Sequence, residues 1–332
     1  MSQNLVLVTG GTGYIASFTI LQLLQQGYNV RTSIRSLAKE EKLRSSFEGL
    51  VGKEVVEKNL DVFAADLSSD ANWEQNFKGV DYVLHLASPF PLAEPENPDD
   101  LIIPAREGTL RILKASAKEP SVKQVVITSS FGSIGYGHGN SRTEPFTEKD
   151  WTQVDGEGVS TYIKSKTLAE KAAWDFVNEN KPHFHLTVIA PAGIFGPVLP
   201  NSTANSSSID IIKAILFGAF KDGVPIYAFP IVDVRDVAKI HIASIENPKA
   251  YNERFLLCGT KVYNLLDVAA SLKKSVPESF HENFPTKELD GSKAPVKKVD
   301  TKKVIEAFDW TPVATEDESL AASAKSVLEA SS

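Results

Sequence analysis

A tyrosine and a lysine in this sequence have the residue types and the spacing of an acid–base pair. Tyr162 and Lys166 stand four residues apart in the segment YIKSK, so a helix would carry both side chains on one face. A phenol, with an ordinary pKa of about 10, exchanges protons poorly at neutral pH unless a neighbouring ammonium group stabilises the phenolate. The pair is a candidate for proton transfer, although the same spacing also arises by chance on amphipathic helices.

A serine at the end of a predicted strand is the third candidate. The segment KQVVITSS over 123–130 is rich in β-branched residues and ends in Thr128, Ser129 and Ser130. The carboxyl ends of parallel strands face the ligand crevice, where the Ser130 hydroxyl can hydrogen-bond a substrate carbonyl. The alternative for Ser130 is a turn former at the strand end, and Ser129 is expected to pack beneath the site.

A glycine-rich turn near the start of the chain predicts a dinucleotide site. The segment TGGTGYIA over 9–16 follows the predicted strand LVLV and opens a helix. Gly10 permits a tight turn, Gly13 lets the backbone approach a pyrophosphate, and Ala16 allows close packing of the helix on the strand. The N–H groups of the helix start then face the phosphates. The expected contacts come from Gly10, Thr12, Gly13, Tyr14 and Ile15.

The end of the second predicted strand favours NADP over NAD. A site that prefers NAD usually places a carboxylate there, whereas this chain has RTSIRS over 31–36. Arg35, helped by Lys42, supplies the charged donors that a 2′-phosphate needs. The alternative for Arg35 is an ordinary solvated surface charge.

The elements that must position these residues alternate between strands and helices. Strand patterns at 5–10, 28–34, 61–66, 80–87, 123–130 and 185–191 are separated by helix-like stretches, one of them over 99–118. This order predicts an α/β fold with a Rossmann-type, doubly wound parallel sheet. That topology places Asp66 and Leu67 near the adenine of the cofactor, and Ala87 and Ser88 near the nicotinamide ribose.

Two regions are expected. Residues 1–190 form an NADP-binding domain that includes the Tyr162 helix, and residues 191–332 form a smaller, mainly substrate-binding α/β part, with chain exchange between the two. The Gly- and acid-rich stretch at 131–158 is long enough to be a functional loop, and a disordered insert is the alternative.

Composition narrows the partners to small molecules. The net charge of −7 offers no attraction to nucleic acid or to an anionic membrane, and the longest apolar runs, such as AILFGAF at 214–220, cannot span a bilayer. The single cysteine, Cys258, fits a reducing compartment, so a cytoplasmic protein is expected. The six histidines lack metal-ligand spacing, and no metal is predicted.

The motifs together resemble a known superfamily. TGGTGYIA, HLASPF, VVITSS, YIKSK, IFGP and VDVRDVAKIH occur in the order typical of extended short-chain dehydrogenases/reductases. Within that superfamily the chain is similar to the branch of plant dihydroflavonol reductases and yeast-type methylglyoxal and carbonyl reductases. The resemblance implies Ser130, Tyr162 and Lys166 as the catalytic triad of an NADPH-dependent carbonyl reductase. It also implies that Tyr162 and Lys166 contact the cofactor, with Lys166 holding the nicotinamide ribose.

The chain also departs from that branch. Where the branch commonly has Asn-Pro, this chain has Ala190-Pro191-Ala192-Gly193, so backbone contacts from Pro191 and Gly193 to the nicotinamide are expected with a different side-chain network. Phe90 and Phe131 are candidate apolar walls for a small carbonyl substrate, with core packing as the alternative.

Two other functions remain open from the sequence, as does the choice between monomer and homodimer. A nucleotide-sugar epimerase or dehydratase would share the fold and the triad but would retain NAD. A redox-sensing regulator would bind NADP without turnover, although such proteins usually lose the tyrosine–lysine pair that this chain keeps.

Overall fold

The computed structural model describes residues 4–89, 94–139, 142–202, 206–289 and 297–330. Its centre is a seven-stranded sheet in the order β3-β2-β1-β4-β5-β6-β9, and every neighbouring pair is parallel. The predicted Rossmann-type α/β fold is confirmed. The strands are β1 (Leu5–Val8), β2 (Asn29–Ile34), β3 (Leu60–Ala64), β4 (Tyr82–His85), β5 (Gln124–Thr128), β6 (His185–Pro191) and β9 (Glu253–Leu257).

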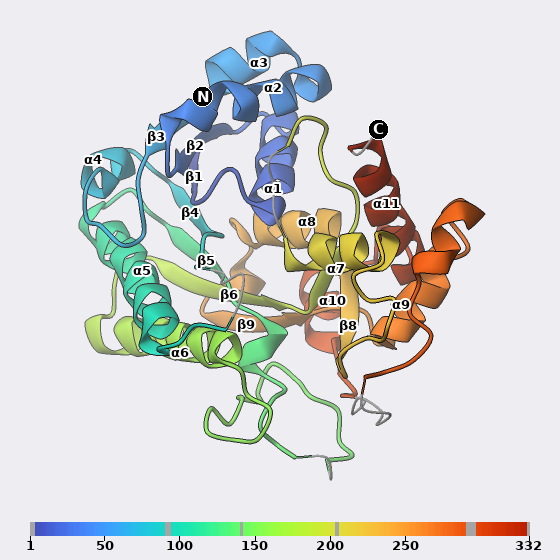
Figure 1. The fold of residues 1–332 in the computed structure, drawn as a ribbon. Coiled ribbons are helices and arrows are strands. Elements are labelled where there is room, and N and C mark those ends of the chain that lie inside the picture. Colours follow the sequence, from blue (N-terminus) through green and yellow to red (C-terminus); the bar gives the residue numbers. More distant parts are fainter. Residues whose placement is uncertain (1–3, 90–93, 140–141, 203–205, 290–296, 331–332) are drawn as a thin grey trace.

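Helices cover both faces of this sheet because its strands are apolar on both sides. In β1, Val6 and Val8 lie in one core cluster while Leu7, between them, lies in the other. One face carries α1 (Tyr14–Gln25), α2 (Glu40–Val51), α3 (Lys53–Asn59) and α8 (Val234–Ser244). The other carries α4 (Trp73–Phe77), α5 (Asp99–Lys118) and α6 (Thr161–Asn180) (Figure 1).

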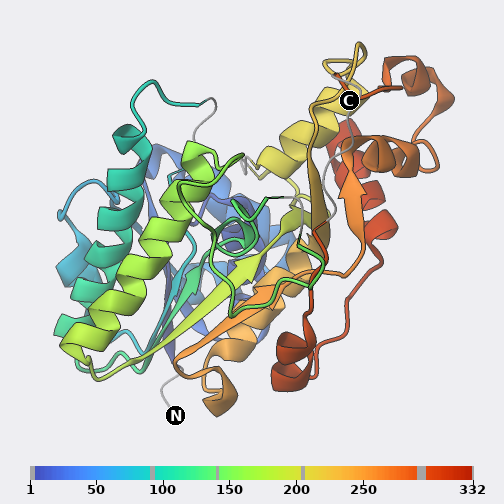
Figure 2. The same cartoon turned by 90° about the horizontal axis from the view of Figure 1, so that it is seen from below.

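A smaller sheet stands beside the central one. It has the order β10-β8-β7, with β7 (Gly193–Phe195) parallel to β8 (Ala228–Asp233) and β10 (Val262–Asn264) antiparallel to it. Figure 2 shows this part, coloured yellow to red, gathered next to one end of the large sheet. Its helices are α7 (Ser207–Leu216), α9 (Leu265–Leu272), α10 (Lys302–Phe308) and α11 (Glu316–Glu329). The chain passes from β8 back to the central sheet as β9 before it forms β10.

The described part of the 131–158 loop is folded onto the body of the protein. It begins with the short 3-10 helix η2 (Phe131–Ser133), and the Thr152 hydroxyl donates to the Gly132 carbonyl at 2.7 Å. The Phe146 N–H donates to Lys298 O at 2.8 Å, which pairs the loop with the segment before α10. These contacts show that the described part of the loop is structured, which disfavours the disordered insert.

In the described part of the chain, none of the helices has the length and apolar character needed to cross a bilayer.

Candidate active site

The glycine-rich turn has the geometry that a bound pyrophosphate requires. Gly10 adopts φ +73°, and a Cβ at this position would lie 2.8 Å from the Cβ of Ala87. Gly13 is the N-cap of α1, and neither a side-chain cap nor an acidic residue occupies the first turn of that helix. The helix start therefore presents N–H groups without a side-chain cap, and a positive dipole, beside the glycine turn.

The turn is tied to the end of β4 by a pair that sequence reasoning did not identify. The Thr9 hydroxyl hydrogen-bonds Nδ1 of His85 at 2.9 Å and accepts from the N–H groups of Leu86 (3.1 Å) and Ala87 (3.0 Å). Burial, followed by the charge of Lys166, lowers the pKa of His85 to about 3, so its ring is neutral. The structure thus brings Ala87, predicted near the nicotinamide ribose, against the glycine turn. The sequence offered one signal for this contact: His85 stands inside the apolar segment VLHLA, where a buried ring needs a hydrogen-bond partner.

Ser130, Tyr162 and Lys166 meet at the carboxyl edge of the sheet. The helix α6 begins where the Ser160 side chain accepts from the Ile163 N–H at 3.3 Å, which places Tyr162 in its first turn. The Ser130 hydroxyl hydrogen-bonds Tyr162 and also accepts from the Gly132 N–H at 3.0 Å. The Lys166 ammonium lies 6.0 Å from the centre of the Tyr162 ring. The three residues predicted to act together therefore share one site.

The protonation of this site follows from its burial. Burial raises the pKa of Tyr162 to about 12; nearby Tyr227 adds to the rise and the Ser130 hydrogen bond opposes it. Burial lowers the pKa of Lys166 to about 8, and Glu170, one turn further along α6, opposes that change. At neutral pH the phenol therefore holds its proton, while the ammonium beside it is charged.

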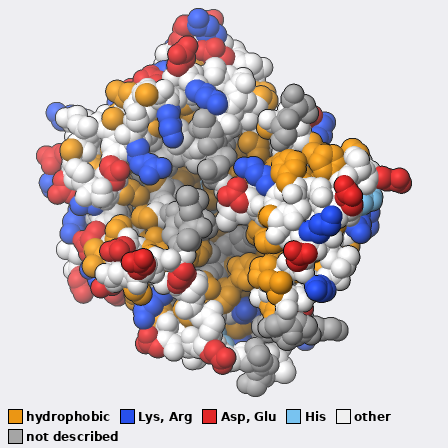
Figure 3. All heavy atoms as spheres, in the orientation of Figure 1, with side chains coloured by type: hydrophobic (Ala, Val, Ile, Leu, Met, Phe, Trp, Pro, Cys, Tyr) orange, Lys and Arg blue, Asp and Glu red, His pale blue; other side chains and the backbone are white. Residues whose placement is uncertain are grey.

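The predicted 2′-phosphate contacts lie on the surface beyond β2. Arg35 and Lys42 are exposed, and in the ranges that the structure describes neither side chain forms an ion pair. The pKa of Asp66 is lowered, first by hydrogen bonds from Ser68 and also by the charge of Arg35, so Arg35 lies close to the predicted adenine region. Basic side chains gather near α2 on the face shown in Figure 3.

For several other predicted cofactor residues the structure gives burial and packing but no contact that identifies a cofactor site. The Tyr14 ring is buried and its hydroxyl donates to Gly196 O at 2.9 Å, so only its backbone can face a cofactor. Leu67 packs on Gly108, and Ile15 packs on the core. Thr12 and Ser88 are half-buried, and Pro191 ends β6.

Gly193 has a packing role that the sequence did not reveal. A Cβ at Gly193 would lie 2.5 Å from the Phe229 ring, so the glycine makes room for that aromatic side chain. Phe229 also stacks on Phe195, with ring centres 5.9 Å apart.

The two predicted apolar walls differ in outcome. Phe90 lies outside the described residues. Phe131 is only 2% exposed and packs edge-on against Tyr136 and Phe146. This burial favours the core-packing alternative for Phe131 over a place in the pocket wall.

A buried ion pair, also missed from the sequence, lies directly behind the triad. Glu170 and Arg254 are 2% and 7% exposed and pair with one another. Glu170 accepts from Ser129 and from Ser133, the latter at 2.6 Å, while Arg254 donates to the carbonyls of Glu148 (2.8 Å) and Asp150 (2.6 Å). The pair thus joins α6, β9, the end of β5 and the 131–158 loop. The position of Glu170, four residues after Lys166, was a usable signal.

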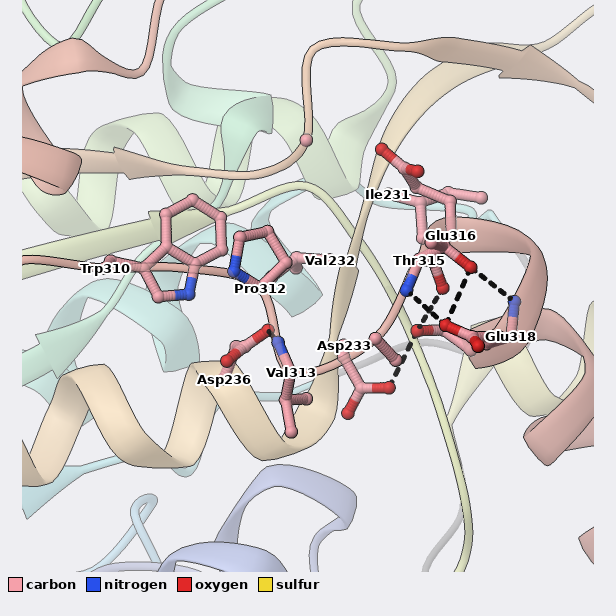
Figure 4. A pocket seen from close by; sticks show the side chains of 13 residues that line it. Ile231, Val232, Asp233, Asp236, Trp310, Pro312, Val313, Thr315, Glu316 and Glu318 are labelled. Carbon is pink, nitrogen blue, oxygen red and sulfur yellow. Dashed lines mark hydrogen bonds between the residues drawn. The ribbon is translucent and has the colours of Figure 1, made fainter.

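The charged residues at 233–236 have structural roles outside the candidate active site. Asp233 caps α8 by accepting from the Arg235 N–H at 2.9 Å and pairs with the Arg235 guanidinium at 2.8 Å. Asp236 accepts from the Val313 N–H at 2.9 Å. Both carboxylates line a cavity of about 350 Å³. Figure 4 shows them there with Trp310, and Ser130, Tyr162 and Lys166 are not among the lining residues.

Comparisons with known proteins agree with this geometry. The model of the NAD dependent epimerase/dehydratase family matches residues 6–263. A putative NADPH-dependent methylglyoxal reductase of Candida albicans is 31% identical over 338 residues, covering 92% of this chain and 97% of the relative. The crystal structure of yeast methylglyoxal/isovaleraldehyde reductase complexed with NADPH superposes with a TM-score of 0.86 at 27% identity, covering 98% of this chain and 99% of that one.

A sugar-nucleotide enzyme is a more distant relative. UDP-glucose 4-epimerase of Thermotoga maritima superposes with a TM-score of 0.76 at 21% identity, covering 99% of this chain and all of that one, a likeness that extends to the fold alone. The family match spans well over half of the chain and coincides with the glycine turn, the triad and the parallel sheet. The chain therefore belongs to the NAD dependent epimerase/dehydratase family, the extended short-chain dehydrogenases/reductases that its motifs predicted.

Proposed function

We propose that this chain is an NADPH-dependent carbonyl reductase that converts a small ketone or aldehyde to the alcohol. One observation carries the proposal: Ser130 hydrogen-bonds a protonated Tyr162 beside the buried ammonium of Lys166, at the carboxyl edge of a parallel sheet. Relatives named as NADPH-dependent reductases, which cover nearly the whole chain, support the same reaction.

The residues present fit NADPH. Gly10 lets the turn pack closely on Ala87, where a Cβ would lie only 2.8 Å from the Ala87 Cβ, and α1 offers N–H groups without a side-chain cap beside that turn. Arg35 and Lys42 are exposed cations without ion-pair partners among the described residues, which suits a 2′-phosphate. These features favour NADPH over the retained NAD of a sugar-nucleotide epimerase.

Each member of the triad has a separate task. NADPH, when bound, supplies the hydride. Ser130 orients the carbonyl oxygen, and Tyr162 donates its proton to that oxygen as negative charge develops there. Lys166 stabilises the phenolate that remains on Tyr162, which lowers the energetic cost of giving up the proton.

We further propose the division of labour predicted from the sequence, with residues 1–190 holding NADPH and residues 191–332 contacting mainly the substrate. The passage of β9 into the central sheet supports chain exchange between these regions. We also propose a cytoplasmic enzyme that acts as a monomer or homodimer and does not bind nucleic acid, in line with its net charge of −7.

Initial rates of NADPH oxidation test the function, measured in parallel with NADH against aliphatic, aryl and β-keto ester carbonyls. Oxidation of NADPH with at least one carbonyl class is expected. Tight NADPH binding without turnover would support the sensor alternative, and NAD retained through purification would support the epimerase alternative.

Replacing Arg35 with Ser is expected to weaken NADPH binding by roughly ten- to a hundredfold, the range for a lost hydrogen bond to a charged group. Binding of NADH should change little because NADH lacks the 2′-phosphate. Fluorescence titration with both cofactors measures the effect. Arg106→Ser is the matched control, since Arg106 is a surface arginine that pairs with Glu107. An equal loss for NADPH and NADH would contradict the assignment of Arg35.

A further inference from the structure

Three tyrosine hydroxyls, from segments far apart in the sequence, gather at the candidate site. The Tyr136 hydroxyl donates to the Tyr227 hydroxyl at 3.3 Å. Tyr227 lies close enough to Tyr162 to raise its pKa, and Tyr162 has the same effect on the pKa of Tyr136. Tyr136 and Tyr162 also pack on one hydrophobic cluster. Two phenols beyond the proton donor therefore lie near Tyr162.

The backbone holds Tyr136 in a fixed position. A Cβ at Gly135 would lie 2.3 Å from the Phe131 ring, and a Cβ at Gly137 would lie 2.2 Å from Gln153 O. The Tyr136 N–H donates to the Thr152 hydroxyl at 3.0 Å, and its carbonyl accepts from the Gln153 N–H at 3.0 Å. The segment can follow this path only because glycines flank Tyr136. The fold therefore fixes the backbone from which the Tyr136 side chain extends.

Tyr227 reaches the same place from the smaller part of the protein. Its ring packs on Phe229, with centres 5.1 Å apart, and Phe229 fits over Gly193. Tyr227 remains 43% exposed, whereas Tyr136 is 8% exposed. Tyr227 therefore forms the solvent side of the tyrosine pair, where an entering substrate would meet it.

The direction of the hydrogen bond decides what the pair can do. Because Tyr136 donates to Tyr227, the Tyr227 O–H remains available, and its hydroxyl has no acceptor among the described residues. A hydroxyl that accepts one hydrogen bond becomes a better donor in the next. The pair therefore presents a donor to a substrate acceptor near, but distinct from, the reacting carbonyl oxygen.

We infer that Tyr136 and Tyr227 determine substrate specificity by binding a second oxygen of the substrate, so that carbonyl compounds with a nearby ether, hydroxyl or carbonyl oxygen are preferred over plain ketones. The inference rests on the proposed reductase function. Tyr227 contacts the second oxygen, and Tyr136 is a positioning residue that orients the Tyr227 hydroxyl.

Matched ketones test the inference because they differ only in one atom or group. Methoxyacetone and 2-pentanone form one pair, and 4-methoxy-2-butanone and 2-hexanone form a second with the oxygen one bond further away. Comparing each ratio of kcat/KM between wild type and variant cancels the intrinsic reactivity of the ketones. Tyr227→Phe should lower the preference for the oxygenated member of at least one pair by roughly five- to tenfold, the effect of one uncharged hydrogen bond.

Further variants separate this role from simple packing. Tyr136→Phe should lower the same preference by a smaller factor, through a rise in KM for the oxygenated ketone that exceeds any rise in KM for the plain ketone. Tyr251→Phe, at a tyrosine that stacks on His185 away from the site, should leave every ratio at the wild-type value.

The possible failures are distinguishable. Equal loss on both ketones of each pair would overturn the inference and assign Tyr227 to packing or to proton supply, and unchanged rates would also overturn it. In both cases wild-type turnover would still support the reductase. If none of the tested carbonyl compounds supported NADPH oxidation by the wild type, both the proposed function and this inference would be contradicted.

Discussion

Replacing Tyr162 with Phe is expected to lower kcat for carbonyl reduction by about 10²- to 10⁴-fold, the range that a positioned general acid contributes. The ring is retained in this variant, so its packing against the Tyr136 cluster persists while the proton is lost. In the wild type, burial raises the pKa of Tyr162 to about 12, so the phenol is protonated across the neutral range and ready to donate. Single-turnover NADPH oxidation with a saturating ketone measures the loss directly.

Two comparisons make the result specific to proton donation. NADPH affinity should remain within about twofold of wild type because Arg35 and the glycine turn supply the proposed contacts to the cofactor's phosphates. Ser130→Ala should cost less than Tyr162→Phe, since Ser130 orients the carbonyl and holds no proton for transfer. A near-wild-type kcat in Tyr162→Phe would show that Tyr162 is not the proton donor. The hydrogen bond between Ser130 and Tyr162 would then have no catalytic role.

The sequence could predict those parts of the site whose geometry is set by a few consecutive residues. The spacing of Tyr162 and Lys166 sets one helix face, and Gly10 with Gly13 sets one turn, so these placements follow from a few consecutive residues. Phe131 shows the limit: it is adjacent to Ser130, yet the 3-10 turn sends its ring into the core.

The residues that sequence reasoning missed depend on tertiary contacts between distant segments. Tyr227 meets Tyr136 across 91 positions, and Arg254 meets Glu170 across 84. No sequence periodicity links such distant positions. They come together only because β8 and β9 pack where they do in the folded protein. Glu170 could have been found from local sequence, because it stands one turn after Lys166 and so lies on the same helix face.

Replacing Glu170 with Gln is expected to lower the free energy of unfolding by about 3–5 kcal/mol, because Arg254 would remain buried and charged without its counter-ion. The amide also loses acceptor capacity for the hydroxyls of Ser129 and Ser133. Urea unfolding followed by fluorescence measures the change. Glu329→Gln, at an exposed glutamate paired with Lys325, is the matched control and should cost less than about 1 kcal/mol.

The double variant Glu170→Gln with Arg254→Met separates the unpaired charge from the lost contacts. Removing both charges should recover part of the stability, since the cost of a broken buried pair lies mainly in the partner left behind. Failure to recover any stability would mean that Arg254 acts through its bonds to the carbonyls of Glu148 and Asp150 and its stacking on Trp151.

Glu170 should also leave a signature in the pH profile that a purely structural residue would not. Burial lowers the pKa of Lys166 to about 8, and the negative charge of Glu170 opposes that change. The ammonium exists below its pKa, so kcat/KM for NADPH, which reports the free enzyme, should fall as pH rises through about 8 in the wild type. Without the Glu170 charge the pKa of Lys166 drops further, and the fall should begin at lower pH. An alkaline limb that stays in place in folded Glu170→Gln protein would show that the buried pair stabilises the fold behind the triad without tuning Lys166.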